Sequence, residues 1–266
     1  MSGRLAGKTA VVVGAGQTAG ETIGNGRATA VLFAREGARV LCVDRDLSSA
    51  AETCEMIAAE GGEAIAFRAD ITAEIDCKAL VAEATLRLRR LDILHNNVGV
   101  GVGDNSITRL AEADWERIIA VNLKGMWLTI KHALPAMRAQ GGGVIVNISS
   151  LAAIAPANII AYEVSKAGVN KLTTTTAALN ARHGIRCNAI MPGLMDTPMA
   201  IESIARARGE SLDAVRAARA ARVPLGGRMG TAWDVAYAAL FLASDEAKFI
   251  TGAIIPVDGG ASVRLG

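Results

Sequence analysis

The sequence predicts an α/β fold, with one doubly wound parallel sheet of seven strands and helices on both of its faces. Short apolar runs alternate with longer Ala-rich, amphipathic segments along the whole chain. The short runs are continuously apolar, which is typical of strands that are buried on both faces. No linker-like stretch interrupts the 266 residues, so we expect a single domain over residues 1–266.

The seven predicted strands follow one another at intervals that leave room for a helix between them. They cover residues 9–14, 38–44, 63–70, 91–97, 143–149, 185–191 and 252–258. Parallel neighbours need such long crossover connections. Pro135 lies late in the helix predicted over residues 113–140, and we expect it to kink that helix or limit its last turns. Residues 194–225, after the sixth strand, break the rhythm of strand and helix.

The composition excludes several classes of protein. Hydrophobic residues make up 51% of the chain and charged residues 20%, which favours a folded core over disorder. The net charge is only +2 and aromatic residues are 3%, so we expect no nucleic-acid partner. No apolar run has the roughly 18 residues of a membrane span, and the four cysteines form no CxxC pair. We therefore expect a reduced, cytoplasmic protein with no membrane contact and no metal site.

The first predicted strand runs into the glycine-rich stretch VVVGAGQTAGETIGNGRATA, residues 11–30. A glycine turn between a strand and a helix lets a pyrophosphate approach the free N–H groups and the positive dipole end of the helix. Asp44 ends the second strand, 18 residues after Gly26, close to the offset at which a carboxylate meets the adenosine ribose. This arrangement predicts a dinucleotide site. The carboxylate would repel a 2′-phosphate, which favours NAD over NADP, although Arg45 beside it weakens that preference.

A second constellation is Tyr162-Glu163-Val164-Ser165-Lys166, which follows the run VNISS ending at Ser150. Tyr162 and Lys166 are four residues apart and so share one face of a helix. A tyrosine has a pKa of about 10 in water, and a nearby ammonium lowers that pKa, so Tyr162 could exchange a proton with an alcohol. An isolated pair of this kind is more often an ordinary surface pair, but the surrounding motifs favour catalysis.

At these residues the sequence resembles the short-chain dehydrogenase/reductase family, and the resemblance covers nearly the whole chain. Besides the glycine turn and YEVSK, the matching segments are HNNVG at 95–99, VNLKG at 121–125, VNISS at 146–150, PGLMDTPM at 192–199 and ITGAIIPVDGG at 250–260. The resemblance implies a Rossmann fold, a nicotinamide cofactor and an alcohol or ketone as the small-molecule substrate.

The resemblance also implies a role for four residues. Tyr162 would exchange a proton with the substrate oxygen, and Lys166 would lower the tyrosine pKa and hold the nicotinamide ribose. Ser150 would hydrogen-bond the substrate oxygen, and Asn122 would anchor a water that links Lys166 to solvent. Ser149 stays the alternative to Ser150, because the spacing from Ser150 to Tyr162 is one residue shorter than is usual in the family.

Further residues match the cofactor-binding positions of the family. They are Gly14, Gly24, Asn25 and Gly26 in the glycine turn, Asp44 at the ribose, Asp70 and Ile71 at the adenine, Asn97, Val98 and Gly99 beside the adenosine ribose, and Pro192, Gly193 and Thr197 at the nicotinamide and pyrophosphate, with Tyr162 and Lys166 completing the set.

The glycine turn departs from the family pattern in its length. Gly20, Gly24 and Gly26 fit the usual GxxxGxG spacing, but the first strand ends at Gly14. We therefore assign Gly14, Gly24 and Gly26 to the motif and treat residues 17–23 as an insertion. A surface loop is the plain interpretation of that insertion. The alternative is that Thr18 or Thr22 reaches the pyrophosphate.

We expect the protein to transfer a hydride between NAD(H) and a secondary alcohol or ketone. An NADP-dependent ketone reductase is one alternative. A nucleotide-binding regulatory or scaffold protein without turnover is another, but it would have no chemical need for the full set of Asn122, Ser150, Tyr162 and Lys166. Enoyl reduction is disfavoured, because relatives with that activity generally place the tyrosine and the lysine further apart.

In this family a helical segment after the sixth strand, here about residues 194–225, covers the substrate. It contains five arginines: Arg206, Arg208, Arg216, Arg219 and Arg222. The spacing of the last three favours a solvated helix face, and an acidic substrate is the alternative. Relatives usually assemble as tetramers through the helices after the fourth and fifth strands and the C-terminal strand, so we expect a homotetramer.

Overall fold

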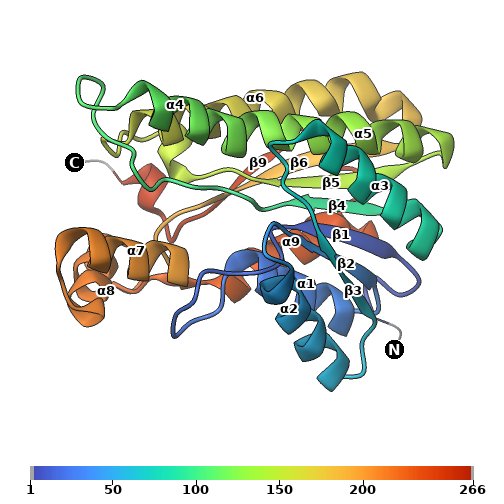
Figure 1. The fold of residues 1–266 in the computed structure, drawn as a ribbon, viewed down its shortest axis with the longest axis horizontal. Coiled ribbons are helices and arrows are strands. Elements are labelled where there is room, and N and C mark those ends of the chain that lie inside the picture. The colour runs from blue at the N-terminus through green and yellow to red at the C-terminus, as the bar shows by residue number, and fades with distance from the viewer. Residues whose placement is uncertain (1–2, 265–266) are drawn as a thin grey trace.

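The computed structural model describes residues 3–264 and contains one parallel sheet of seven strands (Figure 1). Along the sheet the strand order is β3-β2-β1-β4-β5-β6-β9. The strands are β1 (Thr9–Val13), β2 (Arg39–Asp44), β3 (Ala64–Arg68), β4 (Ile93–Asn96), β5 (Gly143–Ile148), β6 (Ile185–Pro192) and β9 (Ile254–Val257). Every neighbouring pair is parallel. The predicted doubly wound α/β fold is confirmed.

Helices cover both faces of this sheet, as Figure 1 shows. One face carries α1 (Asn25–Arg35), α2 (Leu47–Ala59) and α9 (Ala232–Ala243). The other carries α3 (Glu74–Leu88), α4 (Glu112–Ile119), α5 (Gly125–Ala139) and α6 (Ile160–Asn180). Two separate hydrophobic clusters result, one on each face of the sheet. Alternate side chains of one strand belong to different clusters: Val12 joins the α1 and α9 side, whereas Val11 and Val13 join the α3 and α5 side.

The helix predicted over residues 113–140 is interrupted. A π-helical turn, Ala120–Lys124, separates α4 from α5. Such turns add a residue to one turn of a helix and often lie at functional sites. The turn contains Asn122, one of the predicted catalytic residues. Pro135 lies inside α5, which continues beyond it to Ala139.

The segment after β6 forms a smaller unit at the carboxyl ends of the strands. A two-stranded sheet joins β7 (Met195–Asp196) to β8 (Gly230–Thr231), and between them lie α7 (Pro198–Arg208) and α8 (Leu212–Ala220). A small apolar cluster around Ile201 and Val215 holds these two helices together. In Figure 1 they stand apart from the main helical layers, beside the blue loop that connects β1 to α1.

Two further findings concern residues 3–264. No helix in that range is both long and apolar enough to cross a bilayer. No group of three or more His, Cys, Asp or Glu side chains within it could hold a metal ion.

Candidate active site

The carboxyl ends of the parallel strands bring the predicted glycine turn and the turn after β4 into contact. Gly14 follows β1 with φ at +82°, a conformation that favours glycine. Gly26, in the first turn of α1, is so close that a β-carbon there would overlap the carbonyl oxygen of Gly14. The amide of Asn97 donates to that same oxygen at 3.1 Å, and Val98 packs against Gly14. These contacts place Gly14, Gly26, Asn97 and Val98 side by side.

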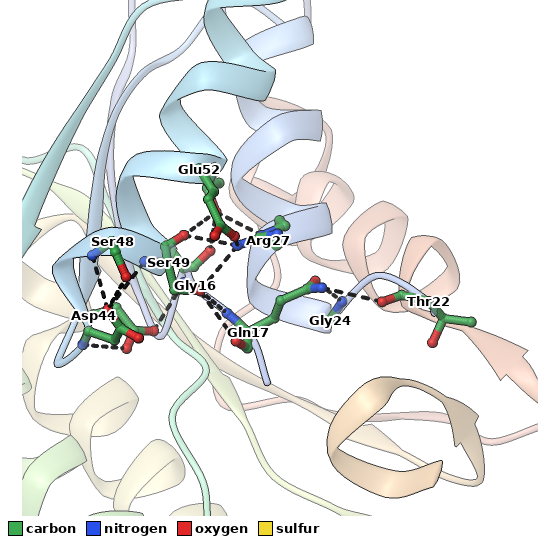
Figure 2. Close-up of polar contacts among 12 residues, drawn as sticks. Gly16, Gln17, Thr22, Gly24, Arg27, Asp44, Ser48, Ser49 and Glu52 are labelled. Carbon is green, nitrogen blue, oxygen red and sulfur yellow. Dashed lines mark hydrogen bonds and ion pairs between the residues drawn. The ribbon is translucent and has the colours of Figure 1, made fainter. Parts of the chain in front are cut away.

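The N-terminus of α1 is open toward this turn. Gly24 is its N-cap and offers no capping side chain, so the first N–H groups of the helix remain available to an anion. The Oδ1 atom of Asn25 is buried without a hydrogen-bond partner among the described residues. Gln17 closes the loop behind them, because its Oε1 accepts the Gly24 N–H at 2.9 Å (Figure 2). A helix end without a cap and an unused buried acceptor fit a dinucleotide at this position.

Asp44 lies where β2 ends and ties the glycine turn to the turn after that strand. Its Oδ2 accepts the Gly16 N–H at 3.0 Å, and its Oδ1 accepts the Asp46 N–H at 3.1 Å (Figure 2). A β-carbon on Gly16 would press on Asp44 and on Ser49. The sequence motif assigned no role to Gly16 or Ser49, although the place of Gly16 in the glycine-rich stretch, two residues after Gly14, was a signal for the first of them.

Arg27 contributes no positive charge to the site. Its guanidinium points from α1 to α2, where it is buried against Ser49, Thr53 and Glu52 (Figure 2). The ion pair with Glu52, at 2.7 Å, satisfies its charge. Arg27 therefore binds the two helices to each other.

The predicted insertion at residues 17–23 reaches the helices that follow β6. Glu21 forms a 2.9 Å ion pair with Arg216 of α8, and a β-carbon on Gly20 would overlap Pro198 and Glu202 of α7. Thr18 is exposed, and the carbonyl of Thr22 accepts a long hydrogen bond from Gln17. The insertion thus bridges the glycine turn and the smaller helical unit rather than forming an isolated surface loop.

The second predicted cluster is formed by α6 and the end of β5. Ser150 follows β5, and its hydroxyl lies on the side of the Tyr162 phenol, whose pKa it lowers; it also accepts the Ala152 N–H at 3.2 Å. Ser149 points the other way, is buried, and donates to the carbonyl of Lys166 at 3.1 Å. Only Ser150 therefore faces the phenol of Tyr162.

Tyr162 and Lys166 share a face of α6, as their spacing predicts. The Lys166 ammonium lies 5.6 Å from the centre of the Tyr162 ring and donates to the carbonyl of Ile148 at 2.9 Å. Burial lowers the pKa of Lys166 to about 8. Burial also raises the pKa of Tyr162, while the hydrogen bond with Ser150 and the charge of Arg219 act in the opposite direction. The groups that lower the tyrosine pKa here are thus Ser150 and Arg219.

Asn122 holds the site together from the π-helical turn. Its Oδ1 accepts the Val100 N–H at 2.7 Å, and its Nδ2 donates to the Val100 carbonyl at 2.9 Å and to Ser165 at 3.1 Å. The side chain is fully buried. A β-carbon on Gly99 would approach both the Lys166 ammonium and the Asn122 amide. Asn122 therefore couples the turn after β4 to α6, directly beside Lys166.

The remaining predicted residues lie at the same edge of the sheet with different exposure. Asp70 is exposed, and its Oδ1 accepts hydrogen bonds from the backbone and the side chain of Thr72, which lower its pKa. Ile71 is only 6% exposed, because its side chain packs against Gly125 of α5. An adenine contact by Ile71 would thus involve little of that side chain.

Pro192 ends β6, and Gly193 packs tightly against Asp258. Thr197 is the N-cap of α7 and is buried, and its hydroxyl makes no capping bond to the helix. These residues lead from the end of β6 into the smaller helical unit.

Two residues at the site had no motif to identify them. Asp104, in the loop after β4, accepts the backbone N–H of Tyr162 at 2.7 Å. Arg219 of α8 acts on the Tyr162 phenol through its charge. The spacing of Arg216, Arg219 and Arg222 favoured a solvated helix face, but only Arg222 is exposed, whereas Arg216 and Arg219 are partly buried.

Comparisons with known proteins identify the family of the chain. A family described as "Enoyl-(Acyl carrier protein) reductase" matches residues 19–262. Cis-4-hydroxycyclohexanecarboxylate dehydrogenase of Sinomonas cyclohexanicum is 40% identical over 261 residues, covering 98% of both chains. The structure of a putative short-chain dehydrogenase/reductase from Burkholderia xenovorans is 43% identical, with a TM-score of 0.91, and the match covers 99% of this chain and 100% of that one. Levodione reductase is 31% identical, with a TM-score of 0.92 and coverage of 98% and 100%.

Proposed function

The chain belongs to the short-chain dehydrogenase/reductase family, whose members use nicotinamide cofactors, and on this premise we propose that it is an NAD(H)-dependent oxidoreductase for a secondary alcohol and its ketone. The observation that carries the proposal is that Lys166 lies on the same face of α6 as Tyr162, 5.6 Å from the centre of its ring, with the Ser150 hydroxyl on the side of the phenol. A hydroxyl held beside a phenol can bind a carbonyl or carbinol oxygen between them.

Tyr162 is the proton-transfer group in this proposal. It donates its proton to the carbonyl oxygen in reduction and takes the proton of the alcohol in oxidation. Ser150 donates a hydrogen bond to the same oxygen and stabilises the negative charge that develops on it. The nicotinamide cofactor, when bound, supplies or accepts the hydride. Lys166, with a pKa of about 8, is mostly protonated at neutral pH, and in this proposal its ammonium holds the nicotinamide ribose, whereas Ser150 and Arg219 lower the pKa of Tyr162.

The carboxylate of Asp44 supports NAD over NADP. It lies at the carboxyl end of β2, and two backbone N–H groups, of Gly16 and Asp46, hold its oxygens in place. A carboxylate in this position accepts hydrogen bonds from a ribose and repels a 2′-phosphate. The open N-terminus of α1 would hold the pyrophosphate.

Two relatives are named for reactions of alcohols or ketones: a hydroxycyclohexanecarboxylate dehydrogenase and a levodione reductase. These names support a cyclic secondary alcohol as the first substrate to test. The matched family description names enoyl reduction. The four-residue spacing of Tyr162 and Lys166 favours the alcohol reaction instead, as expected from the sequence.

The test is turnover of secondary alcohols with NAD and with NADP, followed by nicotinamide absorbance. In Tyr162→Phe we expect kcat to fall by about 100-fold or more, because the proton-transfer group is lost. Tyr237→Phe is the matched control, since Tyr237 is the second tyrosine of the chain and is exposed on α9. In Asp44→Asn we expect the preference for NAD over NADP to shrink by about tenfold. Turnover that survives in Tyr162→Phe would refute the mechanism, and tight NAD binding without turnover on any alcohol would favour a silent nucleotide-binding protein.

We also propose that the chain forms homotetramers through α5 and α6. The residues Ile119, Leu123, Trp127 and Leu172, together with Lys124, line a groove at these helices, and Trp127 is 44% exposed. A contiguous apolar patch of this kind marks an interface. Sedimentation of the wild type and of Trp127→Glu tests this, with a shift toward smaller species expected in the variant.

A cytoplasmic location completes the proposal, supported by four cysteines that are free in the structure.

A further inference from the structure

Arg219 differs from the other four arginines of the segment that follows β6. Arg206, Arg208 and Arg222 are exposed to solvent. Arg216 forms ion pairs with Glu21, Asp196 and Asp213. Arg219 is partly buried, and among residues 3–264 no carboxylate forms an ion pair with it. Within the described part of the chain its one hydrogen bond is from Nη2 to the carbonyl of Met195, at 3.3 Å.

The Nε atom of Arg219 is buried and has no hydrogen-bond partner in the described part of the chain. A guanidinium carries five N–H donors, and a buried donor without an acceptor destabilises the folded state. Burial and the charges of Arg222 and Arg208 also lower the pKa of Arg219. The charge of Asp196 partly offsets this effect, but no described residue accepts a hydrogen bond from Nε, so we expect the missing acceptor to come from a ligand.

The position of Arg219 identifies which ligand this is. Arg219 lies in the last turn of α8 and is anchored to Met195 in β7, directly after the end of β6. Its charge acts on the phenol of Tyr162, and the phenol acts on Arg219 in turn. Arg219 is thus held by Met195 just beyond the carboxyl end of β6, at the edge of the sheet where the proposed substrate would meet Tyr162.

We propose that Arg219 binds a carboxylate of the substrate, so that the protein interconverts a hydroxy acid and the corresponding keto acid. The inference rests on the proposed function and narrows its substrate class. The planar guanidinium matches a carboxylate with two parallel hydrogen bonds. The carboxylate takes no part in the bond changes: the hydroxyl proton goes to Tyr162 and the hydride to the nicotinamide, as in the proposed reaction.

A phosphate is the other anion that a guanidinium binds well. In a carrier-bound thioester, a long flexible arm separates the phosphates from the carbon that reacts. Arg219 is close enough to Tyr162 for their charges to interact. A carboxylate on the substrate itself therefore fits this position better than a phosphate at the far end of such an arm.

The test compares three probes that differ in charge: 4-hydroxycyclohexanecarboxylate, its primary amide, and cyclohexanol. The variants are Arg219→Gln and Arg219→Lys, with Arg222→Gln as the matched control, because Arg222 is exposed and lies three residues further along. In Arg219→Gln we expect kcat/KM for the acid to fall about 10- to 100-fold, with smaller changes, under about threefold, for the amide and for cyclohexanol. Arg219→Lys should recover part of the loss, and Arg222→Gln should stay within about threefold.

A binding measurement separates this inference from the proposed function. Calorimetry with Tyr162→Phe and NAD, a protein that cannot complete the proposed reaction, gives the dissociation constant of the acid without turnover. Weaker binding of the acid in the Arg219→Gln, Tyr162→Phe double variant, with an unchanged dissociation constant for NAD, supports a carboxylate site even if no alcohol is oxidised. Equal binding of acid and amide by the Tyr162→Phe protein overturns the inference. The inference is also overturned if Arg219→Gln lowers kcat/KM for a 3-hydroxyacyl-coenzyme A thioester but not for the acid.

Discussion

The carboxylate of Asp104 accepts the backbone N–H of Tyr162, with Oδ2 2.7 Å from that nitrogen. Its Oδ1 accepts the N–H groups of Ala161 and Asn105, at 3.3 and 2.8 Å. A side chain from the loop after β4 therefore satisfies the first N–H groups of α6, a task usually done by a capping residue of the helix itself. The negative charge also lies at the positive end of the helix dipole.

We predict that Asp104→Ala weakens both stability and catalysis. The loss of a cap costs about 0.5–2 kcal/mol of the free energy of unfolding, and the first turn of α6, which carries Tyr162, loses its support. We expect kcat to fall more than KM rises, and Asp104→Asn to retain most of the activity because it keeps one acceptor. Denaturant unfolding and steady-state kinetics measure both effects. Glu112→Ala, at an exposed site in α4, is the control, and equal effects of the two alanine variants would contradict the prediction.

The burial of His95 leads us to predict how the free energy of unfolding depends on pH. Its ring is fully buried in β4, lies edge-on to Phe33, and has no hydrogen-bond partner for either nitrogen among the described residues. Burial lowers the pKa of His95 from 6.5 to about 3. Below pH 6.5 the unfolded chain binds a proton that the folded protein does not, so this group makes stability fall as the pH decreases from 6.5 toward 3.

In His95→Val that dependence should disappear. The difference in the free energy of unfolding between variant and wild type should grow by about 2 kcal/mol from pH 7 to pH 5 in favour of the variant. Urea unfolding at the two pH values measures it. His183→Gln, which removes a histidine near the surface, should leave the difference between the two pH values close to that of the wild type. If the difference in the free energy of unfolding between His95→Val and wild type is the same at pH 7 and pH 5, the His95 ring takes up its proton in the folded protein as it does in the unfolded chain, and the prediction is wrong.

We predict that Gly26→Ala weakens cofactor binding as well as the stability of the fold. A β-carbon at residue 26 would overlap the Gly14 carbonyl and press on Asn97, so the N-terminus of α1 must move away from β1. We expect stability to fall by about 1–3 kcal/mol and the dissociation constant of NAD to rise about tenfold or more, as measured by calorimetry. Gly61→Ala is the control, because Gly61 has a positive φ but open space around it. It should reduce stability by about 1 kcal/mol without affecting NAD binding.

From the ion pair between Glu21 and Arg216 we predict that changes in the glycine turn and in α8 affect cofactor release together. Glu21 is 64% exposed, so its removal should change the free energy of unfolding by less than about 1 kcal/mol. We expect Glu21→Gln to increase the rate of NADH release about two- to fivefold instead, because the insertion loses its ion pair with α8 and keeps only the packing of Gly20 against α7. Stopped-flow fluorescence measures the rate. Glu21→Gln and Arg216→Gln should not add in the double variant, and fully additive effects would refute the coupling.

Local patterns were sufficient to predict the architecture, and they predicted site residues that the structure places along the carboxyl edge of the sheet. The continuous apolar runs and their spacing predicted seven parallel strands, and the structure confirms them within a few residues at each end. The assignment of Gly14 rested on where the first strand ends, and the overlap of Gly26 with Gly14 gives a physical reason for it. By contrast, the π-helical turn at Asn122 could not be predicted, because it depends on the contacts of Asn122 with Val100 and Ser165.

Taken by itself, the amino-acid sequence determined which segments form strands and helices, where the glycine turn lies, and which tyrosine and lysine share a helix face. These properties depend on residues close together along the chain, through backbone geometry and the period of apolar side chains. Only the tertiary structure decided that Ser150 rather than Ser149 faces Tyr162, that Asp104 supports α6, and that Arg216 is paired while Arg219 keeps an unpartnered donor beside the site. Each of these depends on distances between segments far apart in the chain, which packing around the sheet sets.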